Sequence, residues 1–536
     1  EDAFGKCFSL KDITLPDSIK EIQKGAFYSC DSLQSINIPK SLKKIEKMAF
    51  SYCNELDNIF IPENIETIGD SAFYSCKGLN NVQIAEGVKN IDTFAFSSCG
   101  QLSNINIPST VKSISSDAFS YCINLKNIEL PEGLQSIGHS AFGGSGIESI
   151  VIPNSVNNLE YATFRFCQSL ESAVLPDHLE KIENELFLSC SSLKNIKLPE
   201  NLKIIGESAF TKCSSLENLT LPKNLKIIDT NSFKGCKNLK NITLPESVID
   251  LGAYAFAESG VEEIKIPENI KSLKDHLFDS CENLKEVKLP NKLFSIENFV
   301  FNNCQNLKTI NLPESLNEIN DSAFNACSSL TRLNLPENVV KIGNNAFSNC
   351  TNLQSINLSN KLKIIGNYAF QFAPITKIDL PDSVGFIGNF AFDGCSKLEK
   401  VKLPKNLLSI SNGLFQRCSN LSKIDIPSSI KSIGSYAFAL ANFNEITIPE
   451  NVKTLGNGVF YNNPKLTTIT LPKNLNTIKA QAFDSCPSLK EINIPNSVTE
   501  LGSIRDFNFF EKTENGFKLS NDQSLTSLPR NSLKVS

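Results

Sequence analysis

The sequence is poor in the features that usually mark an enzyme, a nucleic-acid-binding protein or a membrane protein. It contains three histidines in 536 residues and no C-x-x-C pair. Its net charge is -5, so it lacks the basic excess that is typical of a dedicated nucleic-acid-binding protein. No apolar run approaches the roughly 18 residues that are needed to cross a bilayer. We therefore expect no nucleic-acid partner and no membrane span in this chain.

One unit of about 23 residues, by contrast, is repeated along almost the whole chain. Its consensus is P-x-x-L-x-x-I-x-x-x-A-F-x-x-C-x-x-L-x-x-I-x-L, and the L-x-x-I-x-L segment occurs 22 times, from Leu10–Leu15 to Leu489–Ile494. A period of roughly 20–29 residues built on this segment predicts a leucine-rich solenoid. We therefore predict a repeat solenoid of the α/β-type leucine-rich repeat class. It should have about 22 stacked coils of 22–23 residues, with short parallel strands on the concave face.

Within one coil, the residue pattern predicts which side chains are buried. In Leu33–Ile38, the alternation about Ile36 indicates a short strand that Pro39 ends, because proline cannot donate the next ladder hydrogen bond. The phenylalanine of each Ala-Phe pair should stack on its counterparts in a column through the core. Glycine often follows the isoleucine that precedes this pair, as at Gly69 and Gly138, and we expect a positive φ there.

All 17 cysteines occupy one position of the repeat, three residues after the phenylalanine, from Cys7 to Cys486. Parallel, inward-facing thiols on neighbouring coils lack the usual disulfide dihedral angle, and an odd number cannot pair completely. We therefore predict a column of buried free thiols. Free thiols fit a reducing compartment, but buried cysteine also persists elsewhere, so the compartment stays open.

The ends of the chain depart from the repeat. Glu1–Cys7 enters the repeat halfway, so we expect the N-terminus to be truncated within a repeat. We expect residues 1–501 to form the solenoid and residues 502–536 to form a C-terminal cap and tail. Glu514–Gly516 separates the apolar segments Ile504–Phe510 and Phe517–Leu519, and Asn-Gly in this setting predicts a hairpin. A solenoid needs such a cover for its last coil.

The repeat resembles the BspA-like, or Treponema pallidum-type, class of leucine-rich repeats. The match is carried in one coil by Ile68, Ala72, Phe73, Cys76 and Leu79. Another coil repeats it with the set Ile387, Ala391, Phe392, Cys395, Leu398, Val401 and Leu403. The resemblance implies a surface protein that binds host matrix proteins, host cells or other microbes. It supplies no catalytic motif.

The sequence offers no constellation for catalysis or for a cofactor. His139, His178 and His276 lie in different coils, which keeps their side chains apart. There is no phosphate loop, G-x-S-x-G or H-E-x-x-H. We therefore predict a protein that is not an enzyme, with no catalytic, metal-binding or cofactor-binding residues.

Two outward-facing columns, one residue before and one residue after the central isoleucine of each front segment, are the candidate binding surface. The N-terminal half is rich in amides, and Asn81, Asn104 and Asn127 are possible ligands for a glycan or an extended peptide. The same amides would also suit a self-bonded stack without a ligand.

The C-terminal half carries mixed charge, and its densest basic patch is a second possible site. This patch consists of Lys377, Lys400, Lys402 and Lys423, with Asp379 and Asp425 nearby. A solvated charged face without a ligand is the alternative.

The sequence therefore predicts a non-enzymatic binding protein, adhesin-like, at the cell surface or secreted. It would engage host or matrix proteins or glycans through its elongated face. The alternative is an intracellular, cytoplasmic scaffold whose repeats match a periodic partner or one another. The identity of the partner and the oligomeric state stay open.

Overall fold

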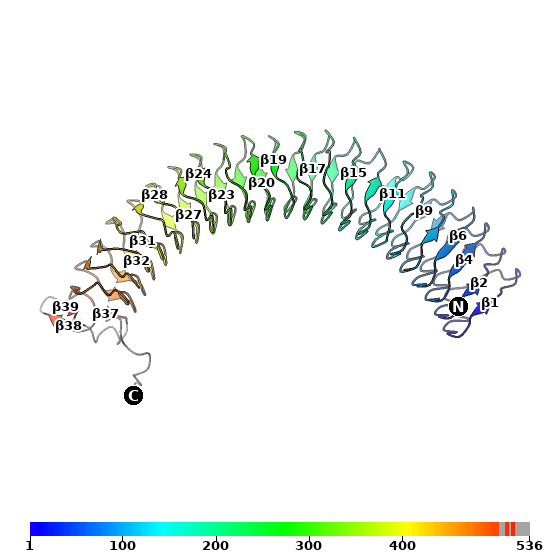
Figure 1. Cartoon of the computed structure of the whole chain (residues 1–536), viewed down its shortest axis with the longest axis horizontal. Coiled ribbons are helices and arrows are strands. Elements are labelled where there is room, and N and C mark those ends of the chain that lie inside the picture. Colours follow the sequence, from blue (N-terminus) through cyan, green and yellow to red (C-terminus); the bar gives the residue numbers. More distant parts are fainter. Residues whose placement is uncertain (503–509, 514–515, 520–536) are drawn as a thin grey trace, which may run out of the picture. The chain divides into compact units, whose positions relative to one another are not determined.

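The structure is a computed structural model of the chain, and it describes residues 1–502, 510–513 and 516–519. The chain consists of two compact units, unit 1 from Glu1 to Asn269 and unit 2 from Ile270 to Ser536. Each unit is a stack of coils that follow one another in sequence order (Figure 1). The described residues make about 21 turns, which matches the sequence because 22 repeated segments enclose 21 intervals. The predicted leucine-rich repeat solenoid is confirmed.

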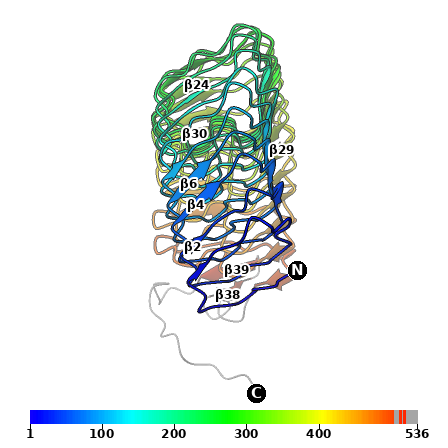
Figure 2. The ribbon, with the colours of Figure 1, turned by 90° about the vertical axis from the view of Figure 1, so that its right-hand side faces the viewer.

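Each coil carries up to two short strands on opposite sides. The front strands come from the L-x-x-I-x-L segments, and the back strands come from the L-x-x-I segments that precede Ala-Phe. In Figure 2, the front strands β24 (Arg332–Asn334) and β30 (Lys400–Lys402) lie on one side of unit 2, and the back strand β29 (Phe386–Ile387) lies on the other. The described residues include no helix. The back of each coil, where an α/β-type repeat would have a helix, forms a short strand or a turn instead.

The front strands of unit 1 are β1 (Asp12–Ile13), β2 (Ser35–Ile36), β4 (Asn58–Ile61), β6 (Asn81–Ile84), β8 (Asn104–Ile105), β11 (Ser149–Val151), β13 (Ser172–Val174), β15 (Asn195–Lys197) and β19 (Glu263–Lys265). Those of unit 2, besides β24 and β30, are β21 (Glu286–Lys288), β26 (Ser355–Asn357), β28 (Lys377–Asp379), β33 (Glu445–Thr447) and β35 (Thr468–Thr470). Front strands of adjacent coils pair in parallel and in register, as in Asn58↔Asn81 and Lys377↔Lys400. Each outward position therefore forms a column along the paired strands of its unit.

The back strands have two residues each and also pair in parallel. In unit 1 they are β3 (Lys44–Ile45), β5 (Thr67–Ile68), β7 (Asn90–Ile91), β9 (Ser113–Ile114), β10 (Ser136–Ile137), β12 (Asn158–Leu159), β14 (Lys181–Ile182), β16 (Ile204–Ile205), β17 (Ile227–Ile228) and β18 (Asp250–Leu251). In unit 2, besides β29, they are β20 (Ser272–Leu273), β22 (Ser295–Ile296), β23 (Glu318–Ile319), β25 (Lys341–Ile342), β27 (Ile364–Ile365), β31 (Ser409–Ile410), β32 (Ser432–Ile433), β34 (Thr454–Leu455), β36 (Thr477–Ile478) and β37 (Glu500–Leu501).

Phenylalanine rings form the predicted column through the core of each unit. The ring centroids of Phe27 and Phe50 lie 5.5 Å apart in unit 1, and those of Phe324 and Phe347 lie 5.4 Å apart in unit 2. The ring planes deviate from parallel by 5° and 7° in these two pairs. One coil cannot bury its own ring, so the stability of a coil depends on its two neighbours.

The corner that carries each Ala-Phe pair is held by backbone hydrogen bonds between coils. The amides of Ser71, Phe73 and Ser75 each donate to a carbonyl of the next coil at 2.8 Å. Ser71 and Ser75 have φ values of 57° and 56°, in the left-handed region. Because these bonds fix the backbone, non-glycine residues tolerate a conformation that L-amino acids otherwise disfavour.

The expectation of positive φ at the glycine before this corner is wrong. The φ of Gly69 lies outside the positive range, and a Cβ there would lie 2.5 Å from the carbonyl oxygen of Ile45 in the preceding coil. At Gly138, a Cβ would lie 2.5 Å from the amide nitrogen of Ser116. These glycines are therefore required by the close approach of neighbouring backbones.

The described part of the C-terminal segment forms one antiparallel strand pair. Strand β38 (Phe510–Thr513) pairs with β39 (Gly516–Leu519), which agrees with the predicted hairpin. Residues 503–509, 514–515 and 520–536 lie outside the described residues, and with them most of the predicted cap. The division into a solenoid over 1–501 and a cap over 502–536 therefore stays a prediction.

Candidate binding surface

The front strands present the candidate surface because their residues alternate between core and solvent. In β4, Ile59 and Ile61 are buried, whereas Asn58 and Phe60 are exposed. Each coil thus contributes outward side chains before and after its central apolar residue. In-register parallel pairing sets neighbouring coils about 4.8 Å apart, so these columns present closely spaced polar groups.

The amide column of unit 1 bonds to itself where the sequence placed a possible ligand site. The Nδ2 of Asn104 donates to Oδ1 of Asn81 at 2.7 Å, and both residues are on paired front strands. Asn127 follows in the same column but lies outside any strand. The contact between Asn81 and Asn104 uses one donor and one acceptor of the two amides. It matches the amide stack bonded to itself, which is the alternative to a ligand site.

The lysines of the basic patch lie together on the front face of unit 2, and one of them is neutralised by an ion pair. Lys377 and Lys400 are register partners, and Lys402 pairs with Asp425 in an isolated bridge. The Nζ of Lys377 lies 2.7 Å from Oδ2 of Asp379 on the same strand. Lys400, Lys402 and Lys423 are exposed and have no ion-pair partner within the described residues.

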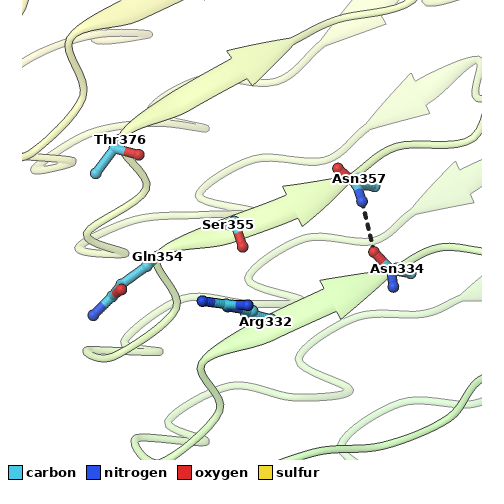
Figure 3. A pocket seen from close by; sticks show the side chains of 6 residues that line it. All are labelled: Arg332, Asn334, Gln354, Ser355, Asn357 and Thr376. Carbon is cyan, nitrogen blue, oxygen red and sulfur yellow. Dashed lines mark hydrogen bonds between the residues drawn. The ribbon is translucent and has the colours of Figure 1, made fainter.

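A shallow hollow of about 420 Å³ lies beside this patch on the same face. Figure 3 shows the six residues that line it: Arg332, Asn334, Gln354, Ser355, Asn357 and Thr376. They come from β24, β26 and the residues just before β26 and β28. The Nδ2 of Asn357 donates to Oδ1 of Asn334 at 2.6 Å, which orders one side of the hollow. The short side chain of Ser355, between longer neighbours, accounts for the depression.

None of the six lining residues was among the site residues predicted from the sequence, and Arg332 is the cation among them. It stands in the same outward column as Lys377, Lys400 and Lys423, and its register partner is Ser355. The guanidinium is exposed and has no ion-pair partner within the described part of the chain. The sequence signal was available, because Arg332 is one of the charged residues of this outward column in the C-terminal half of the chain. It was not grouped with the lysines because the coil of Ser355 lies between Arg332 and Lys377.

A ladder of side-chain carbonyls on the back turns also escaped the sequence analysis. Asn344 Oδ1 accepts from the backbone amide of Asn367 at 2.8 Å, and Asn367 Oδ1 accepts from that of Asn389 at 2.7 Å. Similar bonds join other coils of unit 2, including those to the amides of Asn298, Asp321, Asn344, Asn412 and Ser435. The Oδ1 atoms of these asparagines are thus bonded to the backbone of the next coil. The sequence feature that could have predicted this ladder is the recurrence of asparagine or aspartate shortly after the back strand of successive coils.

The thiol column is confirmed as buried and free. Sixteen cysteines are buried, Cys7 is exposed, and none is in a disulfide. The buried thiols donate to phenylalanine carbonyls of the preceding coil, as Cys53 Sγ does to Phe27 O at 3.2 Å and Cys418 Sγ does to Phe392 O at 3.2 Å. Burial raises the pKa of Cys122 to about 12 and that of Cys167 to about 11. These thiols are held in the protonated, unreactive form.

The histidines belong to different coils, and two of them have aromatic or acidic neighbours. His139 stacks on Tyr161 with ring centroids 4.0 Å apart, and the Nδ1 of His276 lies 2.7 Å from Oδ2 of Asp279. Within residues 1–502 and the two short strands beyond them, no group of three His, Cys, Asp or Glu side chains is arranged to hold a metal ion. The described residues also include no helix that could cross a membrane.

Stacked coils, two rows of short parallel strands and a repeated Leu/Ile/Phe core define a leucine-rich repeat protein. The model of the BspA type leucine rich repeat region matches this chain in six copies. They cover residues 1–102, 49–171, 89–217, 159–285, 271–399 and 385–515. The chain therefore belongs to the BspA-type leucine-rich repeat family. No curated protein sequence is significantly similar to it.

Solved structures of bacterial leucine-rich repeat proteins are similar to this chain. One from Bacteroides ovatus is 30% identical, with 74% of this chain and 86% of that chain covered and a TM-score of 0.47. One from Eubacterium ventriosum is 21% identical, with 55% and 83% covered and a TM-score of 0.43. A leucine rich cell surface protein from Faecalibacterium prausnitzii is 18% identical, with 93% and 90% covered and a TM-score of 0.19.

Proposed function

We propose that this chain is a non-enzymatic binding protein of the cell surface that engages host or matrix proteins or glycans through its front face. The observation that carries the proposal is the front face of unit 2. There, Arg332, Lys400, Lys402 and Lys423 are exposed, lie in two adjacent columns and have no ion-pair partner within the described residues. Surface charges without internal partners contribute little to folding, so they are available for recognition.

Membership of the BspA-type family supports a binding role, because leucine-rich solenoids offer an extended face for partners. The repeat itself uses its apolar residues and cysteines for the core, and its asparagine ladder for the backbone. What varies from coil to coil is the outward columns. Recognition is therefore assigned to these columns.

Location is tested by protease treatment of intact cells that produce the protein. Peptides of this chain should be released into the supernatant while a cytosolic control protein stays intact. Protection of the chain until lysis would overturn the surface assignment and favour the intracellular scaffold. In that case, the binding role of the front face would be tested on the assembly that co-purifies with the protein.

A further inference from the structure

We propose that the front face of unit 2, from Arg332 to Lys423, binds an acidic polysaccharide that runs along the stack of coils. This inference rests on the proposed binding function and names the chemistry of its ligand. The hollow at Ser355 would receive a sugar residue beside the guanidinium of Arg332. The lysines of the following coils would contact acidic groups further along the same polymer.

The charges of this face favour an anionic ligand. Over the five coils from Arg332 to Asp425, the two outward columns carry five cations and two carboxylates, with Glu399 next to them, in a chain whose net charge is -5. Only Lys377 is in an ion pair among these cations within the described residues, at 2.7 Å from Asp379. The remaining four cations can reach a ligand without breaking an ion pair. A guanidinium in particular presents a planar set of donors that suits sulfate or carboxylate oxygens.

The neutral side chains of the hollow favour a ligand that is rich in hydroxyl groups. Gln354, Ser355 and Thr376 are exposed and offer amide and hydroxyl groups around the depression. Such groups both donate and accept hydrogen bonds, as sugar hydroxyls do. The bond between Asn357 and Asn334 holds the opposite wall without using all of their donors and acceptors.

The apolar side chains of unit 2 argue against a protein surface or a nucleic acid as the ligand. The exposed large hydrophobic residues in its described part are Phe294, Ile364, Phe372, Phe386 and Leu408. All of them lie on the back strands, next to them or at the Ala-Phe corner, and none is on the front face. High-affinity protein interfaces are usually centred on buried aromatic and apolar anchors. Single-stranded nucleic acids stack their bases on aromatic rings. The front face of unit 2 provides neither.

The spacing of the cations fits an extended polymer. Arg332 and Lys423 are four coils apart in one column, which corresponds to roughly 19 Å at the separation of paired strands. Lys400 lies between them in the same column, and Lys402 is beside it in the adjacent column. A linear polyanion along the stack would meet a cation on most of these coils. A small monovalent anion would contact only one or two of them.

The test uses the full chain and immobilised polysaccharides of defined charge. Heparin supplies sulfate groups, polygalacturonate supplies carboxylates, and dextran is the neutral control. The variants are Arg332→Gln and the triple variant Lys400→Gln, Lys402→Gln, Lys423→Gln. Lys197→Gln is the matched control because Lys197 is an exposed front-face cation in unit 1. Thermal unfolding of each variant verifies that the fold is intact.

We expect the wild-type chain to bind at least one acidic polysaccharide and not dextran, with affinity that falls as salt is added. Arg332→Gln should weaken binding about tenfold, which corresponds to the loss of one charge-assisted hydrogen bond. The triple variant should weaken it further, and Lys197→Gln should stay within about twofold of wild type. Polyglutamate should bind more weakly than the polysaccharide because it lacks hydroxyl groups.

Four results would overturn the inference. These are absence of binding to both acidic polysaccharides, equal binding of dextran, equal loss of affinity in Lys197→Gln, and polyglutamate binding as tightly as the polysaccharide. Each leaves the protease result on intact cells unaffected. A chain that is released from cells but fails this test keeps its proposed surface role and loses only the polysaccharide ligand.

Discussion

Asn463 occupies the cysteine position of its coil and makes the hydrogen bond that cysteine makes elsewhere. Its Nδ2 donates to the carbonyl oxygen of Phe438 at 2.8 Å, just as Cys53 Sγ donates to that of Phe27 at 3.2 Å. An amide can therefore take the place of sulfur as donor to the preceding phenylalanine carbonyl, whereas the shortened coils of Ala373 and Ala441 have no side-chain donor at this position. Asn463 is buried, and its Oδ1 has no hydrogen-bond partner.

Replacing this asparagine by cysteine should stabilise unit 2. Asn463→Cys keeps a donor to Phe438 and removes a buried acceptor without a partner, which should add about 1 kcal/mol to the free energy of unfolding. Urea unfolding measures the change. Asn463→Ala is the control: it leaves the Phe438 carbonyl without its side-chain donor and should destabilise the chain. A lower unfolding midpoint for Asn463→Cys than for wild type would contradict the prediction.

A buried carboxylate beside Arg417 makes a second prediction. Asp393 is 1% exposed, receives hydrogen bonds from Nε and Nη2 of Arg417, and receives another from Gln371 at 2.9 Å. Arg417→Ala should lower the free energy of unfolding by about 2–3 kcal/mol, because the buried Asp393 carboxylate loses its charged partner. The cost stays below that of a fully buried pair because the Arg417 side chain is itself half-exposed to water.

The double variant Asp393→Ser, Arg417→Ala should recover most of that loss. Other coils, such as that of Ser120, carry a buried serine at the position of Asp393. Urea unfolding of the single and double variants gives the comparison. If the double variant were less stable than Arg417→Ala alone, the carboxylate would be stabilising by itself and the argument would fail.

The thiol column should be almost inert in the native protein. Only Cys7 is exposed, so a small thiol reagent at pH 8 should label one cysteine per chain quickly and all 17 after denaturation. Mass spectrometry of the labelled peptides identifies the position. Rapid labelling of a second cysteine in the native chain would show that its coil opens easily.

Stability should decrease in alkaline solution. Burial raises the pKa of Cys122 and of Cys350 to about 12, from an ordinary value of 9.0. Above pH 9, the thiols of the unfolded chain lose protons that the folded chain retains, so the free energy of unfolding falls as the pH rises toward 12.

Urea midpoints at pH 8, 9 and 10.5 measure this decrease. A variant with Cys122→Ser and Cys350→Ser should show a shallower decrease, because serine does not ionise there. Serine already occupies the cysteine position at Ser145 and Ser259. An identical pH dependence in the two proteins would attribute the decrease to other groups.

Two glycines of the same coil should respond in opposite ways to alanine. Gly394 has a φ of 71°, and a Cβ there would lie 2.4 Å from Cδ1 of Phe372. Gly394→Ala should therefore cost roughly 1–3 kcal/mol. A Cβ at Gly385 would meet no atom within 4 Å, and its φ is not positive. Gly385→Ala should be neutral or stabilise by up to about 1 kcal/mol, because it restricts the unfolded chain. Thermal unfolding of both variants measures the two changes in stability, and equal changes would contradict the prediction.

The repeat allowed the coil to be predicted almost residue by residue. The buried pattern of β4, the phenylalanine column and the free thiols all follow from one 23-residue period. They could be predicted because side chains at equivalent positions in stacked coils must share one environment. The role of Gly69 could not be predicted from the sequence, because it depends on how closely the backbone of the preceding coil approaches.

The sequence by itself determined the class of fold and which columns face solvent, because a strand alternates its side chains between core and solvent. Only the tertiary structure decided which outward groups are free. Asn104 is bonded to Asn81 and Lys377 is paired with Asp379, whereas Arg332, beside Ser355, has no ion-pair partner among the residues that the structure describes. The physical reason is that hydrogen bonds and ion pairs form over a few ångströms. For Asn104 and Asn81, which are 23 residues apart in the chain, the approach depends on the register of neighbouring coils; for Lys377 and Asp379, on one strand, it depends on the side-chain conformations.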